Sequence, residues 1–151
     1  MPGKNKDHLV IVDADAIISF VYIDDENHRR AKKIMQQLVT TNVYLLFPTT
    51  AICEAVTVLR GKLNRPEDAK RILTKFQSGD FPVQAVDHAI LTEAGELFNP
   101  NGSKKNTLFD AVVATIAKRL NADAIFSFDE WYRKIGLTLT EDLIAARKQA
   151  A

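Results

Sequence analysis

Short runs of consecutive apolar residues recur along the chain and predict buried β-strands. The clearest runs are residues 9–12 and 124–128, which are rich in β-branched and aromatic side chains. A run without polar alternation is typical of a strand whose two faces are both covered, as in a parallel sheet. The same reasoning predicts strands over residues 43–47 and 81–86 and a brief strand over residues 136–139.

Between these runs, apolar residues recur every three or four positions, which is the spacing of amphipathic helices. Helices are predicted over residues 17–21, 27–38, 49–63, 66–79, 90–98, 107–120, 130–134 and from 140 onward, with Asn27, Thr49 or Thr50, and Thr107 as caps. Strands and helices therefore alternate. This order indicates an α/β fold with a mostly parallel central sheet of about four to five strands.

The composition of the chain limits the domain organisation and the location that we expect. Residues 1–8 are polar and are expected to form a disordered tail, which leaves residues 9–151 as a single domain. The formal charge of +1 neither favours nor excludes a nucleic-acid partner. The single cysteine, Cys53, excludes an intramolecular disulfide, and Asp13 and Asp15 interrupt the first apolar stretch. We therefore expect a cytoplasmic protein without a membrane span.

Four acids occupy unusual places in this pattern. Asp13 and Asp129 each end an apolar run, and Glu54 and Asp110 fall in the expected first turns of apolar helices. The carboxyl ends of neighbouring parallel strands meet at one edge of a sheet, so the four side chains are expected to converge. At about 6 Å and an effective dielectric near 20, each pair repels by roughly 3 kcal/mol. Such a cluster is tolerable only if it is protonated or holds a cation, and oxygen ligands suit Mg²⁺ or Mn²⁺.

Each acid also has a local structural explanation. Asp13 and Asp129 can cap the helices that follow them, and an acid at Glu54 complements a helix dipole. Asp110 comes three residues after Thr107, which is close to a capping box. The four positions taken together favour a shared site, with Asp15 as an outer residue beside it.

The order and spacing of four short motifs resemble those of the PIN domain family of metal-dependent ribonucleases. The motifs are VIVDAD (residues 10–15), PTTAICE (48–54), LFDAVVA (108–114) and AIFSFD (124–129). In length the chain resembles the toxin subunits of VapBC toxin–antitoxin pairs. The resemblance implies a three-layer α/β/α sandwich.

The resemblance also implies a function. One or two Mg²⁺ or Mn²⁺ ions would be held by the four catalytic acids Asp13, Glu54, Asp110 and Asp129, with Asp15 and Ser127 in the outer layer of the site. The expected reaction is RNA hydrolysis that leaves 3′-hydroxyl and 5′-phosphate ends. The expected partners are RNA, a cognate antitoxin and a second copy of the chain. Candidate phosphate contacts are Arg29, Arg30, Lys104 and Lys105.

Two other functions remain open at this point. Asp13 and Asp15 follow a strand as Asp-x-Asp, which resembles the nucleophile and acid–base pair of haloacid-dehalogenase-type phosphatases. That family gives Glu54 and Asp110 no role. A non-catalytic domain that binds RNA or protein is the second alternative. The two aromatic residues Trp131 and Tyr132 could stack on bases or pack in the core.

Overall fold

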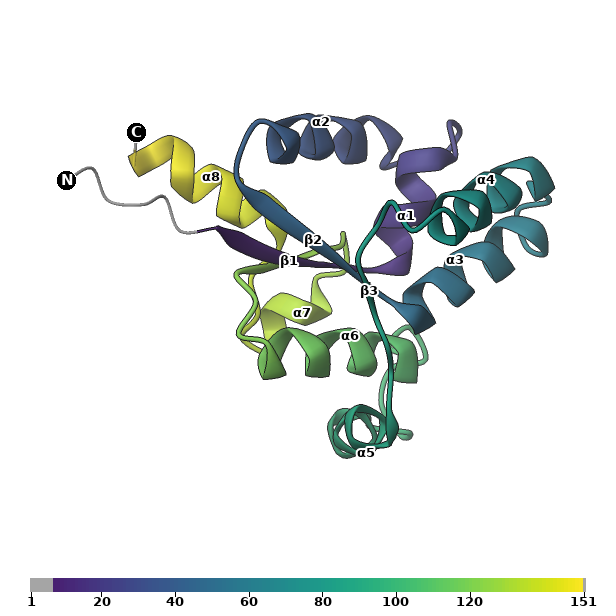
Figure 1. Cartoon of the computed structure of the whole chain (residues 1–151). Coiled ribbons are helices and arrows are strands. Elements are labelled where there is room, and N and C mark those ends of the chain that lie inside the picture. The colour runs from purple at the N-terminus through teal and green to yellow at the C-terminus, as the bar shows by residue number, and fades with distance from the viewer. Residues whose placement is uncertain (1–6, 151) are drawn as a thin grey trace.

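The computed structural model of the chain describes residues 7–150, which are built around a sheet of four parallel strands. The strands are β1 (His8–Val12), β2 (Val43–Pro48), β3 (Val83–Gln84) and β4 (Ala124–Phe126). Their order across the sheet is β3-β2-β1-β4 (Figure 1). The predicted tail falls mostly on residues 1–6, which lie outside the described range, and His8 already belongs to β1.

The central strand β1 explains why the first apolar run has no polar alternation. It pairs with β2 on one side and with β4 on the other. Val10 and Val12 face one core, and Ile11 faces the other, as the two-residue period of a strand requires. All three side chains are almost fully buried.

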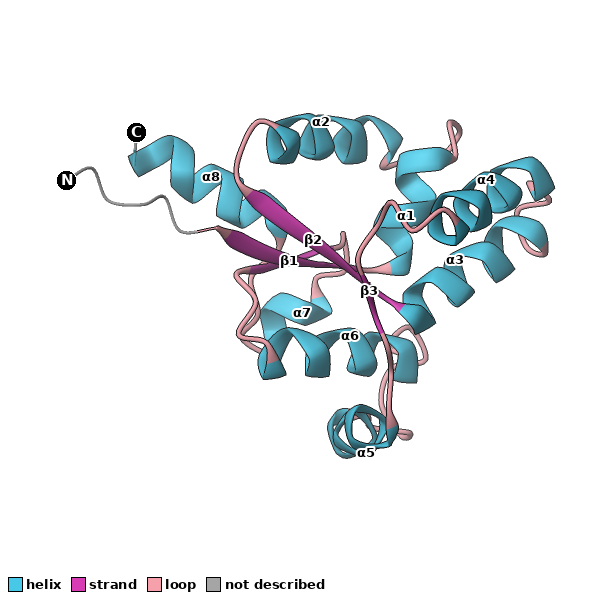
Figure 2. Cartoon of the chain, in the orientation of Figure 1, coloured by secondary structure: helices cyan, strands magenta, loops and turns pink. Residues whose placement is uncertain are grey.

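The helices cover both faces of the sheet, so the predicted three-layer α/β/α sandwich is confirmed (Figure 2). One face carries α1 (Ala14–Val21), α2 (His28–Val39), α3 (Thr49–Arg60) and α4 (Pro66–Gln77). The other face carries α5 (His88–Leu97), α6 (Leu108–Arg119) and α7 (Trp131–Lys134). The last helix, α8 (Thr140–Ala150), packs beside β4 and α2. None of the helices in residues 7–150 has the length and apolar character needed to cross a bilayer.

Three predicted strands are shorter than expected. The run at 81–86 forms only Val83–Gln84, an edge strand that begins after Pro82, which lacks the N–H that a ladder needs. The run at 124–128 pairs only as far as Phe126 before the chain turns away. The predicted strand over 136–139 is a single bridge between Leu139 and Ile125.

Two helix starts also differ from the prediction. Helix α1 begins at Ala14, directly after Asp13, rather than at residue 17. Helix α3 begins at Thr49, so Pro48 occupies the cap position and neither threonine caps the helix with its side chain. Asn27 occupies the cap position of α2 but makes no side-chain cap bond there.

Candidate active site

The predicted acids lie on four different segments at the carboxyl edge of the sheet. Asp13 follows β1, Asp129 follows β4 after a short turn, and Asp110 lies in the first turn of α6. Glu54 lies beyond the first turn of α3, because that helix starts at Thr49. We call these four residues together with Asp15 the acidic rim.

Asp13 is the most buried member of the acidic rim, with 3% of its surface exposed. Its Oδ1 accepts a hydrogen bond of 2.7 Å from the N–H of Ala14, and its Oδ2 accepts one of 2.7 Å from the hydroxyl of Tyr132. Burial, and then the charges of Asp15 and Asp110, raise the pKa of Asp13 well above its ordinary value, against the effect of those two donors. Asp13 therefore caps α1, and its surroundings disfavour the ionised form of its carboxyl group.

Asp15 lies between Asp13 and the turn after β4. Its Oδ2 accepts hydrogen bonds from the hydroxyl of Ser127 at 3.0 Å and from the N–H of Phe128 at 2.8 Å. Its Oδ1 is buried and accepts no hydrogen bond of normal geometry within residues 7–150, although the nearby N–H of Ala16 lowers the pKa of Asp15. Burial raises the pKa of Asp15 to about 6, with a further contribution from the charge of Asp129. A buried oxygen without a donor is costly, which indicates that this part of the acidic rim lacks positive charge.

Ser127 connects two acids of the rim. Its hydroxyl donates to Asp15 and accepts the N–H of Asp129 at 3.1 Å. The side chain of Asp129 in turn accepts the N–H of Trp131 at 2.9 Å, which fixes the start of α7. The role predicted for Ser127, a hydrogen bond to a metal ligand or to phosphate, stays a prediction.

Asp110 and Glu54 differ in how they are held. Asp110 forms a full capping box with Thr107, in which its Oδ2 accepts the Thr107 N–H at 2.7 Å. Burial and the charge of Asp129 raise the pKa of Asp110, while the bonds from Thr107 oppose that rise. Glu54 receives no hydrogen bond within residues 7–150. Burial, followed by the charges of Asp110 and Asp15, raises the pKa of Glu54 to about 7.

These electrostatic effects form a closed set. The charges of Asp15 and Asp110 raise the pKa values of Asp13 and Glu54. The charge of Asp129 raises those of Asp15 and Asp110. These acids are therefore near enough to influence one another's pKa values, and their convergence on one bound ion stays a prediction. No three His, Cys, Asp or Glu side chains among the described residues form a group that could hold a metal ion as they stand. The donor set itself fits a hard cation, because it is all oxygen and includes the buried Oδ1 of Asp15.

The four candidate phosphate contacts are unequal. Arg30 forms a bidentate salt bridge with Glu141 of α8, with bonds of 2.9 and 2.7 Å, and its guanidinium lies over the ring of Phe128. Arg29 on α2 is exposed. Lys104 and Lys105 are exposed in the loop just before the α6 cap, on the side of the rim that carries Asp110.

Tyr132 is the site residue that sequence reasoning missed. It is fully buried and cannot stack on RNA bases, and its hydroxyl reaches Asp13 across 119 positions of sequence. The ring also contacts Trp131, with 5.4 Å between the ring centroids. The only signal in the sequence was a hydroxyl at an otherwise apolar position just after Asp129.

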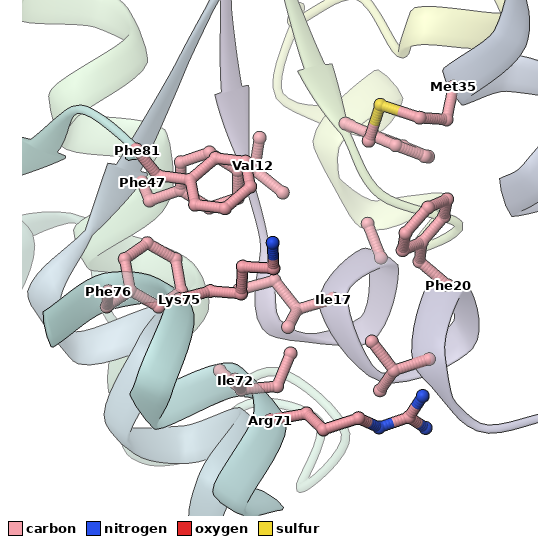
Figure 3. A pocket seen from close by; sticks show the side chains of 13 residues that line it. Val12, Ile17, Phe20, Met35, Phe47, Arg71, Ile72, Lys75, Phe76 and Phe81 are labelled. Carbon is pink, nitrogen blue, oxygen red and sulfur yellow. The ribbon is translucent and has the colours of Figure 1, made fainter. Parts of the chain in front are cut away.

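A second feature lies on the α1–α4 side of the molecule (Figure 3). An open apolar pocket of about 260 Å³ lies between α1, α2 and α4. Its walls include Phe20, Met35, Phe47, Phe76 and Phe81. Two cations, Arg71 and Lys75, stand at its edge in Figure 3. Lys75 has no acidic partner among the described residues, so its charge is available to another molecule. We call this feature the apolar pocket.

Comparison with known proteins agrees with the fold. The family model for the PIN domain matches residues 10–137. The chain therefore belongs to the PIN domain family. This match favours a PIN nuclease over the haloacid-dehalogenase-type phosphatase. No curated protein matches the sequence.

Solved structures of VapC proteins share the fold at low identity. VapC20 from Mycobacterium tuberculosis, a toxin that cleaves the sarcin-ricin loop, has a TM-score of 0.74 at 15% identity, over 85% of this chain and 96% of that one. VapBC2 from Rickettsia felis, bound to a DNA fragment of its promoter, has a TM-score of 0.60 at 14% identity, over 87% and 96%. VapBC-1 from nontypeable Haemophilus influenzae has a TM-score of 0.57 at 19% identity, over 87% and 96%.

Proposed function

We propose that the chain is a Mg²⁺- or Mn²⁺-dependent endoribonuclease and that it acts as a VapC-like toxin in the cytoplasm. One observation carries the proposal above all. Five carboxylates on four segments lie toward the carboxyl edge of the sheet, and burial and neighbouring acids raise the pKa values of Asp13, Asp15, Glu54 and Asp110. No member of the acidic rim forms an ion pair within residues 7–150, and a bound cation would supply the missing positive charge.

The proposed roles follow from how each acid is held. Asp13, Glu54, Asp110 and Asp129 are the ligands of one or two ions, and Asp15 and Ser127 orient them. When bound, such ions supply positive charge to the scissile phosphodiester and acidify a water for in-line attack. Thr107 donates its N–H to Asp110, and Ser127 accepts the N–H of Asp129 and donates its hydroxyl to Asp15, so these contacts are in place before any ion arrives. That preorganisation lowers the cost of assembling the site.

RNA binding requires cations near the acidic rim. Lys104 and Lys105 are the better placed candidates, because their loop leads directly into the helix that carries Asp110. Arg29 is exposed on α2 and remains a candidate. Arg30 is the weakest candidate, since phosphate contact would break its bond to Glu141.

RNA cleavage by the purified protein tests this proposal. Asp110→Asn removes one charge, while its amide oxygen can still accept the Thr107 N–H, so the fold is retained. The substrates are a single-stranded RNA and a sarcin-ricin stem-loop, with Mn²⁺, Mg²⁺ or EDTA. We expect cleavage in the presence of either metal and a loss of roughly 100-fold or more in Asp110→Asn, because the metal contributes several kcal/mol to such reactions.

Glu96→Gln is the matched control, since it removes an exposed acid on α5. It should cleave at the rate of the unmodified protein. Cleavage that survives EDTA, or that survives in Asp110→Asn, would overturn the proposal. RNA binding without cleavage under any condition would instead support the non-catalytic alternative.

We also propose that an antitoxin binds at the apolar pocket. An apolar hollow lined by aromatic residues suits a bulky apolar anchor, and the free charge of Lys75 suits a nearby acid. The expected occupant is therefore a helix with an apolar face and acidic flanks, supplied by the product of the neighbouring reading frame. The resemblance to VapC proteins further suggests a homodimer, which sedimentation of the free protein tests.

Charge reversal tests the position of the antitoxin. Lys75→Glu should weaken the affinity for the purified product of the neighbouring reading frame about tenfold, the equivalent of one lost charge contact. Lys118→Glu makes the same change at an exposed position on α6, across the sheet, and should leave the affinity unchanged. Calorimetry measures both. Equal weakening by the two variants, or no binding at all, would contradict the proposed position.

A further inference from the structure

Tyr132 brings a hydroxyl into a fully buried part of the core. Its side chain has no exposed surface and lies in the core formed by α5, α6, α7 and the sheet, with neighbours such as Ile116 and Leu139. A phenylalanine would fill the same volume without a polar atom. Burying a hydroxyl is costly unless it finds a partner, and this hydroxyl donates to Asp13 at 2.7 Å.

The hydroxyl completes a two-point hold on the carboxylate. Ala14 donates its N–H to Oδ1 of Asp13 and Tyr132 donates its hydroxyl to Oδ2. The two donors come from α1 and from α7, which lie far apart in sequence. Together they set the rotation of the carboxylate plane. Each oxygen keeps a second lone pair, because a carboxylate oxygen can accept more than one bond.

Helix α7 is itself fixed at several points, so the hydroxyl has a defined position. Asp129 accepts the N–H of Trp131 at the start of the helix, and the Tyr132 carbonyl accepts the N–H of Leu137 at 2.9 Å. Arg133 ties the helix to α8 through bonds of 2.8 and 2.9 Å to Asp142. A short helix with these anchors can hold a side chain in one orientation.

We propose that Tyr132 is a positioning residue that orients the Asp13 carboxylate for metal binding. The inference rests on the proposed function, in which Asp13 is a metal ligand. Donors to the ligands of a metal site typically change metal affinity by about 10- to 100-fold when they are removed. The hydroxyl of Tyr132 therefore acts on the site through Asp13, and the ring serves the core.

Calorimetric titration with Mn²⁺ tests the inference without measuring cleavage. Tyr132→Phe removes only the hydroxyl and should weaken Mn²⁺ binding about tenfold. Two controls separate the alternatives. Tyr44→Phe removes a hydroxyl from an exposed tyrosine on β2, and Ile116→Val loosens the same core without touching Asp13. Both should bind Mn²⁺ with the affinity of the unmodified protein.

RNA cleavage adds a second measurement. In Tyr132→Phe, half-maximal cleavage should need about tenfold more Mn²⁺, and the maximal rate should return at high Mn²⁺. A purely structural role for Tyr132 would lower the stability of the metal-free protein, as in Ile116→Val, and leave the Mn²⁺ affinity unchanged. That result overturns the inference.

The outcomes distinguish this inference from the proposed function. If the unmodified protein binds Mn²⁺ and cleaves RNA while Tyr132→Phe behaves identically, only the inference fails. If the unmodified protein binds no Mn²⁺, both fail. If Tyr132→Phe does not fold, the change in tyrosine absorbance on adding Mn²⁺ provides the test instead. This change should persist in Tyr22→Phe and in Tyr44→Phe, because it comes from Tyr132. Its absence from the unmodified protein overturns the inference.

Discussion

Asp13 at the sheet edge and Asp68 on α4 are both buried acids, yet their surroundings act on them in opposite ways. Their exposed fractions are 3% and 2%. Burial alone would raise the pKa of Asp68, but hydrogen bonds and charges from Arg65 and Arg71 hold it below its ordinary value. The strongest influences on Asp13 after burial include two further acids, and its pKa is raised well above its ordinary value.

The difference begins in the sequence. Arg65 and Arg71 lie three residues before and after Asp68, so one helical segment supplies the acid and its counter-charges. The acids of the rim come from four segments, and the donors that reach them are N–H groups and hydroxyls without charge. A structural acid in this protein thus carries its own neutralisation. The acidic rim has no such positively charged partners within residues 7–150. This difference is the physical reason for proposing that the rim binds a cation.

The largest stability effect should come from Asp68. Asp68→Asn removes the charge that two arginines share, and we expect it to lower the free energy of unfolding by about 2–3 kcal/mol, a figure reduced because both arginines are partly solvated. Urea unfolding measures this. Glu67→Gln is the control, since it removes the neighbouring first-turn acid and should cost well under half as much. If the two variants lost equal amounts of unfolding free energy, Asp68 would not be specifically stabilised by its arginines, and the proposed difference from the acidic rim would be contradicted.

Much of the fold followed from local patterns. The apolar runs located β1, β2 and β4, and helical spacing located the major helices, because each depends on burial of residues close in sequence. The edge strand was overestimated because the run at 81–86 has strand-like composition, while pairing depends on Pro82 and on having a neighbour on one side only.

Prediction of the site was uneven for the same reason. The four acids could be proposed from the sequence because the carboxyl ends of parallel strands share an edge, whatever the details of packing. The partner of Tyr132 could not be found, because that contact depends on where α7 lies beneath β1. The engagement of Arg30 likewise depends on α8, since Glu141 lies 111 positions away in sequence. Contacts of that kind are set by tertiary packing.

The pH dependence of stability should separate the two kinds of acid. Glu54 and Asp15 have pKa values raised to about 7 and about 6, from ordinary values of 4.5 and 3.8. The folded state therefore binds protons more tightly than the unfolded state. The stability that these groups contribute is fully present below their ordinary values and is lost as pH rises through 6 and 7.

Without metal, the free energy of unfolding should fall by roughly 1–2 kcal/mol between pH 5 and 7.5, after allowance for solvent screening. Asp68 adds no slope in this window, because its lowered pKa places its titration below 3.8. Urea unfolding in EDTA measures the fall, and saturating Mn²⁺ should remove most of it. Stability that rises with pH over this range in EDTA would contradict the electrostatic account of the rim.

The smallest expected effect comes from Glu54, and its sign is opposite to that of Asp68. Glu54 receives no hydrogen bond within residues 7–150, and it repels Asp110 and Asp15. Glu54→Gln keeps the shape of the side chain and removes the charge, so at pH 8 in EDTA it should raise the free energy of unfolding by about 1 kcal/mol, the discounted cost of one half-buried repelled charge. Glu96→Gln, at an exposed site on α5, should change it by less than half as much. The gain should vanish or reverse when Mn²⁺ is added, because the unmodified protein then gains binding energy that the variant has lost. A variant less stable than the unmodified protein in EDTA would mean that Glu54 belongs with Asp68 as a structural acid.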